Sequence, residues 1–547
     1  MSSAAAARPH PGLWVLVVCL VPWQTVAQTT DGSFRDNKGT EFVLSFVQNF
    51  KRDGHRPQLL ITGSNQSPTS VVVDVPVVGF TSTVNVRFGE VATVNLPRDG
   101  VEMQGSRKDR NAVSIRADDD ITVYGVFSER DSSDGYLGLP TDVLGTEYLV
   151  PCNTVTSNRP EEGFVHIPSE FGLVGVYDNT AVKILPRQHV IFEDQSYDAG
   201  ETITTTLNKF ETLQIQSDDD LTGSRIISDK PVAVLSGNVF TSVGTAAEVR
   251  GSGTHIVEMI PPVSTWGKEF ALVPLKERQK GDVFRVLAAN DDTQVNLTGN
   301  VPRTLQAGEF WEFNLPSYRY KHLTTSKPAL LVQYSKSKTA DQARADPFMM
   351  LVPAVSQFAA NYSFTTVDFA VLRLVGTYHL NVVVSTSEKE GLRLDDNPLD
   401  SGIQWSVIPG TQMSAARLDV MCGSHTLVHI SSAVTFGVSM YGFTDWDGYG
   451  YPGGLRLAAH TLQNVDRGQN TGHQHSMEAK ENMLSTDSPS KTVQWKDYTE
   501  SKILIIGFCA LLLVSMICGV LQIKNMCKVT ISSTSMEVLE LEDSNDD

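Results

Sequence analysis

Cysteine is scarce in this sequence. Only six occur among 547 residues, and only Cys152 and Cys422 lie between the two hydrophobic runs near the chain ends. Modules held together by a framework of disulfides, and zinc clusters built from several cysteine ligands, need more cysteines than this. Two thiols exposed to an oxidising compartment either pair with each other or capture partners. A Cys152–Cys422 disulfide is therefore predicted as one of two alternatives.

Excess positive charge is also absent, because the formal net charge is −18. A nucleic-acid-binding surface requires a basic patch, so this class of function is excluded. No local pattern marks a nucleophile with its base, a nucleotide loop or an EF-hand, and we predict no enzyme activity, cofactor or metal site. The acidic runs Asp118–Asp120, Asp218–Asp220 and Asp395-Asp396 are interpreted as turns.

Long hydrophobic runs are limited to the two ends of the chain. Ile503–Ile523 carries no charged residue and lies between Lys502 and Lys524. At about 1.5 Å per residue, some 20 apolar residues cross a bilayer core of about 30 Å, so this run predicts one transmembrane helix over 503–523. The shorter run Leu13–Trp23 follows Arg8 and predicts a signal peptide over 1–27.

These ends predict a single-pass type I protein of the plasma membrane, with its ectodomain outside the cell. Residues 458–501 are polar and are predicted to form a stalk, and residues 524–547 are predicted to form an acidic cytoplasmic tail. Cys527, just inside the membrane, is a candidate for acylation. Asn65, Asn296 and Asn361 each begin an Asn-x-Ser/Thr triplet and are candidates for N-glycosylation.

The region between the ends contains a degenerate fourfold repeat. An opening signature occurs at Gly39-Thr40-Glu41-Phe42, Gly145-Thr146-Glu147-Tyr148 and Gly267-Lys268-Glu269-Phe270, with a worn copy at Ala359-Ala360-Asn361-Tyr362. A middle signature follows at Gly89-Glu90, Gly200-Glu201, Gly308-Glu309 and Gly410-Thr411. A closing signature follows in turn, at Asp118–Asp120, Ser228–Pro231, Ser326–Pro328 and Ser431-Ser432, and is interpreted as a turn before a buried strand. The repeat units are about 39–130, 145–240, 267–338 and 359–443.

Each unit contains about six or seven short runs rich in Val, Leu, Phe, Tyr and Thr, separated by Gly, Pro, Asn and Asp. No segment outside the membrane run has a sustained helical period. The fold class is therefore an all-β ectodomain of four degenerate β-rich units. A β-sandwich-like unit fits about seven strands in 90–100 residues, and a propeller-like arrangement is the alternative.

Several of these motifs together resemble the N-terminal domain of the IgG Fc-binding protein family. They are the opening signature at residue 39, LGLPTDVLGTEYLV at 137–150, IISDKPVAVLSG at 226–237, Trp266–Phe270 and YGYPGGL at 449–455. The resemblance covers residues 33–457 and implies an all-β extracellular binding region without catalysis. The family name implies IgG Fc as a partner, although the cysteine-rich mucin-assembly domains of the name-giving protein cannot be built from two cysteines.

The sequence thus predicts a cell-surface recognition or adhesion protein that binds an extracellular protein or glycan. An ectoenzyme acting on glycans and a structural surface-coat protein are the alternatives. Several aromatic residues interpreted as exposed in loops are candidates for binding contacts, namely Tyr136, Trp311, Tyr318, Tyr320, Trp405 and Trp446.

The predicted topology can be tested with epitope tags. A tag placed after Ala27 should be stained on intact cells, whereas a tag placed after Asp547 should be stained only after permeabilisation. The reason is that the charge-free run at 503–523 ends translocation of the chain. The reverse staining pattern would contradict the type I arrangement.

Overall fold

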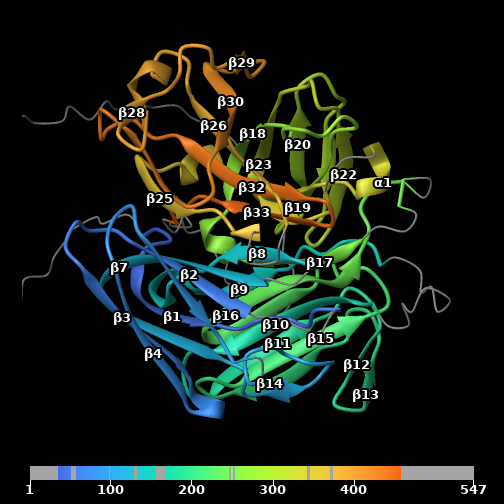
Figure 1. The fold of residues 1–547 in the computed structure, drawn as a ribbon. Helices are drawn as coiled ribbons and strands as arrows, with labels where there is room; N and C mark the ends of the chain where they lie inside the picture. The colour runs from blue at the N-terminus through green and yellow to red at the C-terminus, as the bar shows by residue number, and fades with distance from the viewer. Residues whose placement is uncertain are drawn as a thin grey trace, which may run out of the picture. The chain divides into compact units, whose positions relative to one another are not determined.

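The computed structural model describes residues 35–50, 57–97, 99–127, 132–155, 167–245, 248–249, 253–341, 345–369 and 374–457. All of these residues belong to one folded unit (Figure 1). The predicted signal peptide, stalk, transmembrane helix and tail, together with Cys527, lie outside the described residues. Within the described ranges, no helix is both long enough and apolar enough to cross a membrane.

The described part of the chain is all-β, as predicted. Its α-helix is the single turn α1 (Lys338–Asp341), and short 3-10 turns precede several strands. The strand β3 (Thr69–Val75) shows why the sequence folds this way. Val71, Val73 and Val75 are buried at every second position, while the residues between them are partly exposed. This period of two directs the β-branched side chains into the interior.

The first unit is one antiparallel sheet with the strand order β4-β3-β7-β2-β5. Its central strand β7 is 15 residues long and has different neighbours along its length. The first half pairs with β1 and β3, and the second half pairs with β2 and β8. The strands are β1 (Gly39–Leu44), β2 (Pro57–Gly63), β3 (Thr69–Val75), β4 (Phe80–Val86), β5 (Val91–Asn95), β7 (Val113–Phe127) and β8 (Asp134–Leu137).

The second and third units repeat this order, as β14-β11-β16-β10-β15 and β21-β20-β23-β19-β22. The second unit also contains the hairpin β12–β13, and β6 (Lys108–Asp109) of the first unit extends its sheet. The strands of the second unit are β9 (Gly145–Leu149), β10 (Ser169–Gly175), β11 (Thr180–Leu185), β12 (Val190–Phe192), β13 (Gln195–Tyr197), β14 (Ile203–Leu207), β15 (Thr212–Ser217), β16 (Arg225–Thr241) and β17 (Thr254–Met259). Those of the third are β18 (Gly267–Leu272), β19 (Asp282–Ala288), β20 (Thr293–Leu297), β21 (Arg303–Leu305), β22 (Phe310–Leu315), β23 (Lys321–Tyr334) and β24 (Met349–Leu351).

In the fourth unit the long strand is split into two. β31 takes the place of its first half and β32 that of its second, so the unit forms two sheets, β25-β31-β27-β28 and β29-β30-β26-β32-β33. The strands are β25 (Asn361–Thr365), β26 (Thr377–Ser385), β27 (Leu392–Leu394), β28 (Asn397–Pro398), β29 (Trp405–Val407), β30 (Met413–Val420), β31 (Ser424–His429), β32 (Gly437–Thr444) and β33 (Asp447–Pro452).

The prediction that the closing signatures are turns is wrong for the first three units. Asp118–Asp120, Ser228–Pro231 and Ser326–Pro328 are not turns before a strand, because they lie inside the continuous strands β7, β16 and β23. At each of these places the pairing with the opening strand shifts register. Polar residues and proline suit this point, because the long strand changes neighbours there and fewer of its N–H groups are paired. Only in the fourth unit does the chain leave the strand, around Ser431.

The middle glycines occupy the same turn in all four units. Gly89, Gly200, Gly308 and Gly410 have φ between 77° and 82°. In each case the next residue donates its backbone N–H to the carbonyl three positions earlier. A positive φ at the third position of such a turn defines type II and favours glycine. Strand order and this turn therefore agree between residues 145–240 and 267–338, as the repeat predicted.

The closing strands of the four units meet near the middle of the folded part. β8 packs against β17 and β33, and β24 packs against the same two strands (Figure 1). The two ends of the described chain also pair with each other. Asn37 donates its backbone N–H to the Leu455 carbonyl at 2.9 Å, and Leu457 donates to the Arg35 carbonyl at 2.7 Å. The units thus close on one another, as in a propeller. Units one to three are each built on one curled sheet, with an added hairpin in the second, and this is neither a simple sandwich nor a propeller blade.

Three buried carboxylates tie the closing strands together. Asp134 of β8 accepts the N–H of Val257 in β17 at 3.0 Å and that of Met349 in β24 at 3.5 Å. Glu258 of β17 accepts the N–H of Leu351 in β24 at 3.0 Å. Asp447 of β33 accepts the N–H of Ser133, next to β8, at 3.0 Å. Each contact joins two different units.

The opening glycines are required by close packing between consecutive units. A Cβ atom on Gly145 would lie 2.5 Å from the Cβ of Pro262, and one on Gly267 would lie 2.2 Å from the Cβ of Ala354. Pro262 and Ala354 each precede a 3-10 turn that leads into the next unit. The fourth opening position holds Ala359 instead.

Gly267→Ala should destabilise the protein by about 1–3 kcal/mol, because the added methyl group overpacks against Ala354. The free energy of unfolding of the full-length chain in denaturant measures this. The matched control is Ala359→Gly, the reverse change at the equivalent position, for which we expect a change below about 1 kcal/mol. Equal effects of the two substitutions would show that the opening glycine is not constrained by packing.

Candidate functional site

The structure does not contain the Cys152–Cys422 disulfide that the sequence offered as one alternative, because both cysteines are free. Cys152 is fully buried inside the second unit, where its Sγ lies 3.3 Å from Ser236 Oγ. Burial raises the pKa of this thiol above its usual range, so the reactive thiolate is disfavoured. Cys422 is exposed in the turn between β30 and β31 of the fourth unit.

The three candidate glycosylation residues, Asn65, Asn296 and Asn361, are all exposed. Asn65 donates its side-chain N–H to Asp119, and the side-chain oxygen of Asn361 accepts from Lys38 Nζ at 2.5 Å. These positions are accessible to modification, which itself stays a prediction.

The acidic runs make protein contacts. Asp220 forms an ion pair with the buried Arg285 at 2.7 Å, and Asp395 and Asp396 have positive φ in the tight turn between β27 and β28. Within the described ranges, no three or more His, Cys, Asp or Glu side chains are grouped so that they could hold a metal ion.

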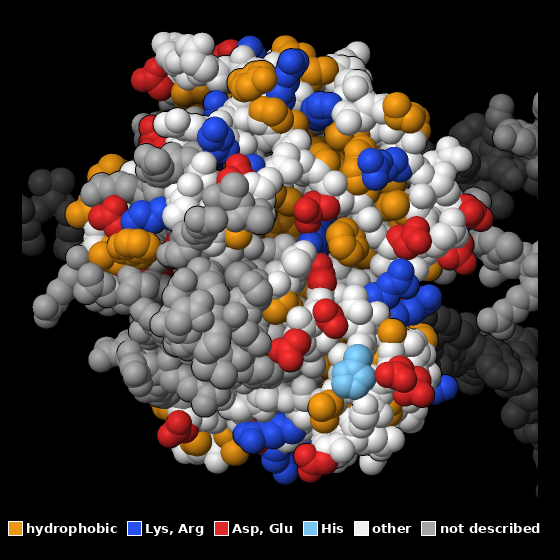
Figure 2. Space-filling view, turned by 90° about the vertical axis from the view of Figure 1, so that its right-hand side faces the viewer, with side chains coloured by type: hydrophobic (Ala, Val, Ile, Leu, Met, Phe, Trp, Pro, Cys, Tyr) orange, Lys and Arg blue, Asp and Glu red, His pale blue; other side chains and the backbone are white. Residues whose placement is uncertain are grey.

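The candidate aromatic residues divide into two groups. Tyr136 and Trp311 are buried in the interior of their units. Tyr318 is 74% exposed and Trp446 is 42% exposed, while Tyr320 and Trp405 are half-buried. Figure 2 shows acidic and basic side chains interspersed on the face that it presents, with no large area of one sign. Charge alone therefore does not mark a binding surface on that face.

A cleft of about 750 Å³ lies where the third and fourth units meet. Smaller clefts lie at the junction of the first and second units and at that of the second and third, with volumes of about 530 and 410 Å³. Ligand pockets commonly measure about 300–1,000 Å³. The cleft between units three and four is in this range and has the more apolar lining, so it is the candidate functional site.

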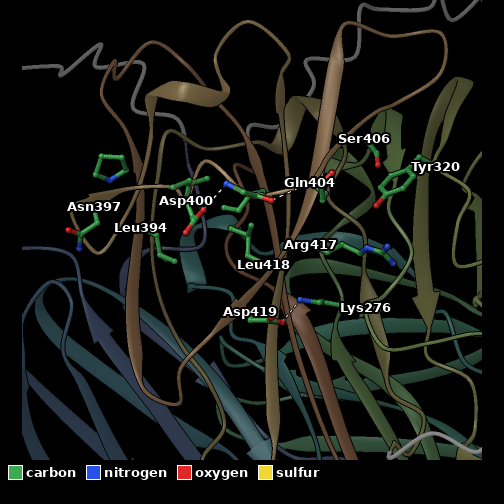
Figure 3. A pocket seen from close by; sticks show the side chains of 14 residues that line it. Lys276, Tyr320, Leu394, Asn397, Asp400, Gln404, Ser406, Arg417, Leu418 and Asp419 are labelled. Atoms are coloured by element: carbon green, nitrogen blue, oxygen red, sulfur yellow. Dashed lines mark hydrogen bonds and ion pairs between the residues drawn. The ribbon is translucent and has the colours of Figure 1, made fainter.

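Two residues of the third unit and a long segment of the fourth unit line this cleft (Figure 3). Lys276 follows β18, and Tyr320 lies in the connection from β22 to β23. The fourth unit contributes the segment from Leu394 to Ser406 and the strand β30. Its apolar side chains are Leu394, Pro398, Leu399, Ile403 and Leu418, and its polar side chains are Asn397, Asp400, Gln404, Ser406, Arg417 and Asp419.

Arg417 joins the two walls of the cleft. Its Nη1 atom donates to the carbonyl oxygens of Leu275 and Ser317, each at 3.3 Å. The guanidinium also lies over the ring of Tyr320, at 5.9 Å from the centroid. Arg417 is on β30 and its contacts are on the third unit, so the guanidinium bridges the two units.

A charged network crosses the same junction beside the cleft. Lys276 Nζ lies 2.5 Å from Asp419 Oδ1, and that oxygen lies 2.9 Å from His379 Nδ1. His379 Nε2 lies 3.5 Å from Glu277 Oε2. Burial alone would raise the pKa of Asp419, but the Lys276 and His379 contacts outweigh it and lower this pKa. Burial lowers the pKa of His379 despite the nearby Glu277 and Asp419.

Sequence reasoning found only Tyr320 among these residues. Lys276 and Asp419 are separated by 143 positions, and no local motif surrounds either one. Their proximity depends on how the third and fourth units pack, which a one-dimensional pattern does not contain.

A second cleft of about 560 Å³ adjoins the first and shares Tyr320 with it. Tyr318, Phe313 and Pro409 line it, together with part of the β20 end. Tyr320 therefore separates two neighbouring hollows, and Tyr318 is exposed at the second of them.

The described fold defines an all-β protein of four repeated units that close on one another. A sequence profile of the family described as IgGFc binding protein matches residues 134–442, more than half of the chain. The chain therefore belongs to this family. The match begins at the first residue of β8, yet the first unit, most of which precedes it, has the same strand order as the next two.

A human protein named IgGFc-binding protein is 27% identical to this chain over 442 residues. The aligned region is 80% of this chain but 8% of the human protein. The chain thus spans less than a tenth of the length of this relative.

The buried His379 predicts a pH dependence of stability. Because its pKa is lower in the folded protein than in the unfolded chain, the unfolded state takes up a proton first as the pH falls below about 6.5. The free energy of unfolding is therefore larger above pH 6.5 and decreases on acidification, by at most about 1.4 kcal/mol per pH unit.

Thermal unfolding of the full-length chain between pH 7.5 and 5 measures this effect. His379→Gln should flatten the decline of Tm below pH 6.5, whereas His189→Gln, which changes an exposed histidine, should leave it unchanged. The same decline in the His379 variant as in the natural chain would contradict this assignment.

Proposed function

We propose that this chain is a single-pass type I cell-surface recognition protein that binds an extracellular protein or glycan. Membership of the IgGFc-binding family supports an extracellular binding role. The charge-free run at 503–523 and the apolar run near the start support anchoring and secretion. The ligand is recognised by the folded part, and the polar segment 458–501 separates that part from the membrane.

The observation that supports a location for the binding site is the cleft between the third and fourth units. It combines an apolar floor, an aromatic side chain and several polar groups, which is the composition typical of ligand sites. Both walls belong to packed strands or to short connections between them, so the cleft exists before a ligand arrives and little ordering is required on binding.

The human relative is named for binding the Fc region of IgG. This chain covers only 8% of that protein. We propose that the chain binds monomeric Fc weakly or not at all, and that display of many copies on a membrane strengthens binding to its own ligand.

Cells that express the full-length chain should bind at least one member of a panel of extracellular proteins and glycans, whereas cells lacking it should not. Purified monomeric Fc should bind with a Kd weaker than micromolar. Submicromolar Fc affinity would overturn the Fc proposal. Self-association of the chain with no binding to any panel member would favour the alternative of a structural coat protein.

A further inference from the structure

The guanidinium of Arg417 is left without an acidic partner in the part of the chain that the structure describes. A guanidinium carries five N–H donors. Only Nη1 is used, for two long bonds to carbonyl oxygens at 3.3 Å. The other donors belong to a half-buried side chain that lines the cleft between units three and four. Arg417 therefore provides both positive charge and unused hydrogen-bond donors to that cleft.

The other charged groups of the cleft do not neutralise Arg417. Lys276 and Asp419 pair with each other at 2.5 Å. Asp400 accepts the backbone N–H of Gly402 at 2.6 Å, and Figure 3 shows it on the far side of Gln404 from Tyr320 and Ser406. The end of the cleft at Arg417 is thus locally positive, and a carboxylate suits it because the planar guanidinium can bind both carboxylate oxygens.

Hydroxyl groups and an aromatic ring surround this positive end. Figure 3 shows Tyr320, Ser406 and Arg417 together on one side of the cleft. Within the described residues, neither the Tyr320 hydroxyl nor the Ser406 hydroxyl makes a hydrogen bond. The amides of Gln404 and Asn397 lie further along the cleft, Gln404 near Leu418 and Asn397 beyond Leu394 (Figure 3). Such a lining matches a ring that has one apolar face and several hydroxyl groups.

We propose that the cleft between the third and fourth units binds an acidic sugar, a carboxylate-bearing pyranose at the end of a glycan. Arg417 receives the carboxylate, Tyr320 packs against the sugar ring, and Ser406 and Gln404 bind ring hydroxyls. A volume of about 750 Å³ has room for one or two sugar rings. This inference rests on the proposed recognition function and specifies its ligand class.

An acidic peptide is the less favoured ligand. An extended peptide gains affinity by pairing with an exposed strand edge. The edge strands beside the cleft are β28 and β29, which contain two and three residues. Edges this short provide few backbone partners for an extended peptide, whereas four of the eight polar side chains that line the cleft are hydroxyls or amides.

The test measures binding of the full-length chain to N-acetylneuraminic acid and glucuronic acid, with the methyl ester of each acid as the neutral probe. The free acids should bind at least about tenfold more tightly than their esters, because the ester cannot accept a charge-assisted pair of bonds from Arg417. Arg417→Gln should weaken binding of the acids about tenfold or more and remove the difference between acid and ester.

Arg319→Gln is the matched control, since Arg319 is an exposed arginine close in sequence to Tyr320 that does not line this cleft. It should leave binding of both acids unchanged. Arg417→Lys keeps the charge but not the planar fork, and should bind the acids with intermediate affinity. Because the acid–ester comparison uses the natural chain, it tests the proposal even if a variant folds poorly.

Three outcomes would overturn this proposal. The esters could bind as tightly as the acids, Arg417→Gln could bind like the natural chain, or an acidic peptide could bind through Arg417 while the acidic sugars do not. The proposed recognition function would survive any of these if the chain still bound a member of the extracellular panel. Failure to bind any panel member would instead contradict the recognition function itself.

Discussion

The contact on which the rest of this fold depends is the meeting of four closing strands around buried carboxylates. Asp134 accepts backbone N–H groups from the second and third units, and Asp447 of the fourth unit accepts one from the residue before Asp134. Burial raises the pKa of Asp134 and of Glu258, although their backbone hydrogen bonds act in the opposite direction. A buried carboxyl without such partners is very costly, so these side chains specify how the strands of different units must align.

The cleft between the third and fourth units follows from this closure. No single unit contains it, because Lys276 and Tyr320 come from one unit and Arg417 and Asp419 from the next. Arg417 bridges the two units, because its bonds to Leu275 and Ser317 cross the junction. The same guanidinium also provides the unused donors of the candidate site, so one side chain has a structural role and a proposed binding role.

Much of the fold could be predicted from the sequence, because each unit has to satisfy the same local constraints. Gly89, Gly200, Gly308 and Gly410 share one turn that requires a positive φ. The opening Gly145 and Gly267 share one close contact with the next unit. Such constraints act over a few residues and leave ordered signatures. The Asp118–Asp120 run was misinterpreted as a turn, because polar residues and proline also suit the point where a long strand exchanges neighbours.

The sequence by itself determined that this protein is all-β and that it contains four repeated units. Its motifs also resemble those of a family whose members indicate an extracellular binding role. These properties come from alternation, turn residues and motifs that are local along the chain. Only the tertiary structure decided that the units close on one another, that Cys152 is buried away from Cys422, and that Lys276 meets Asp419 and His379 beside a cleft. The physical reason is that these contacts join residues far apart in sequence, and their geometry depends on how complete units pack.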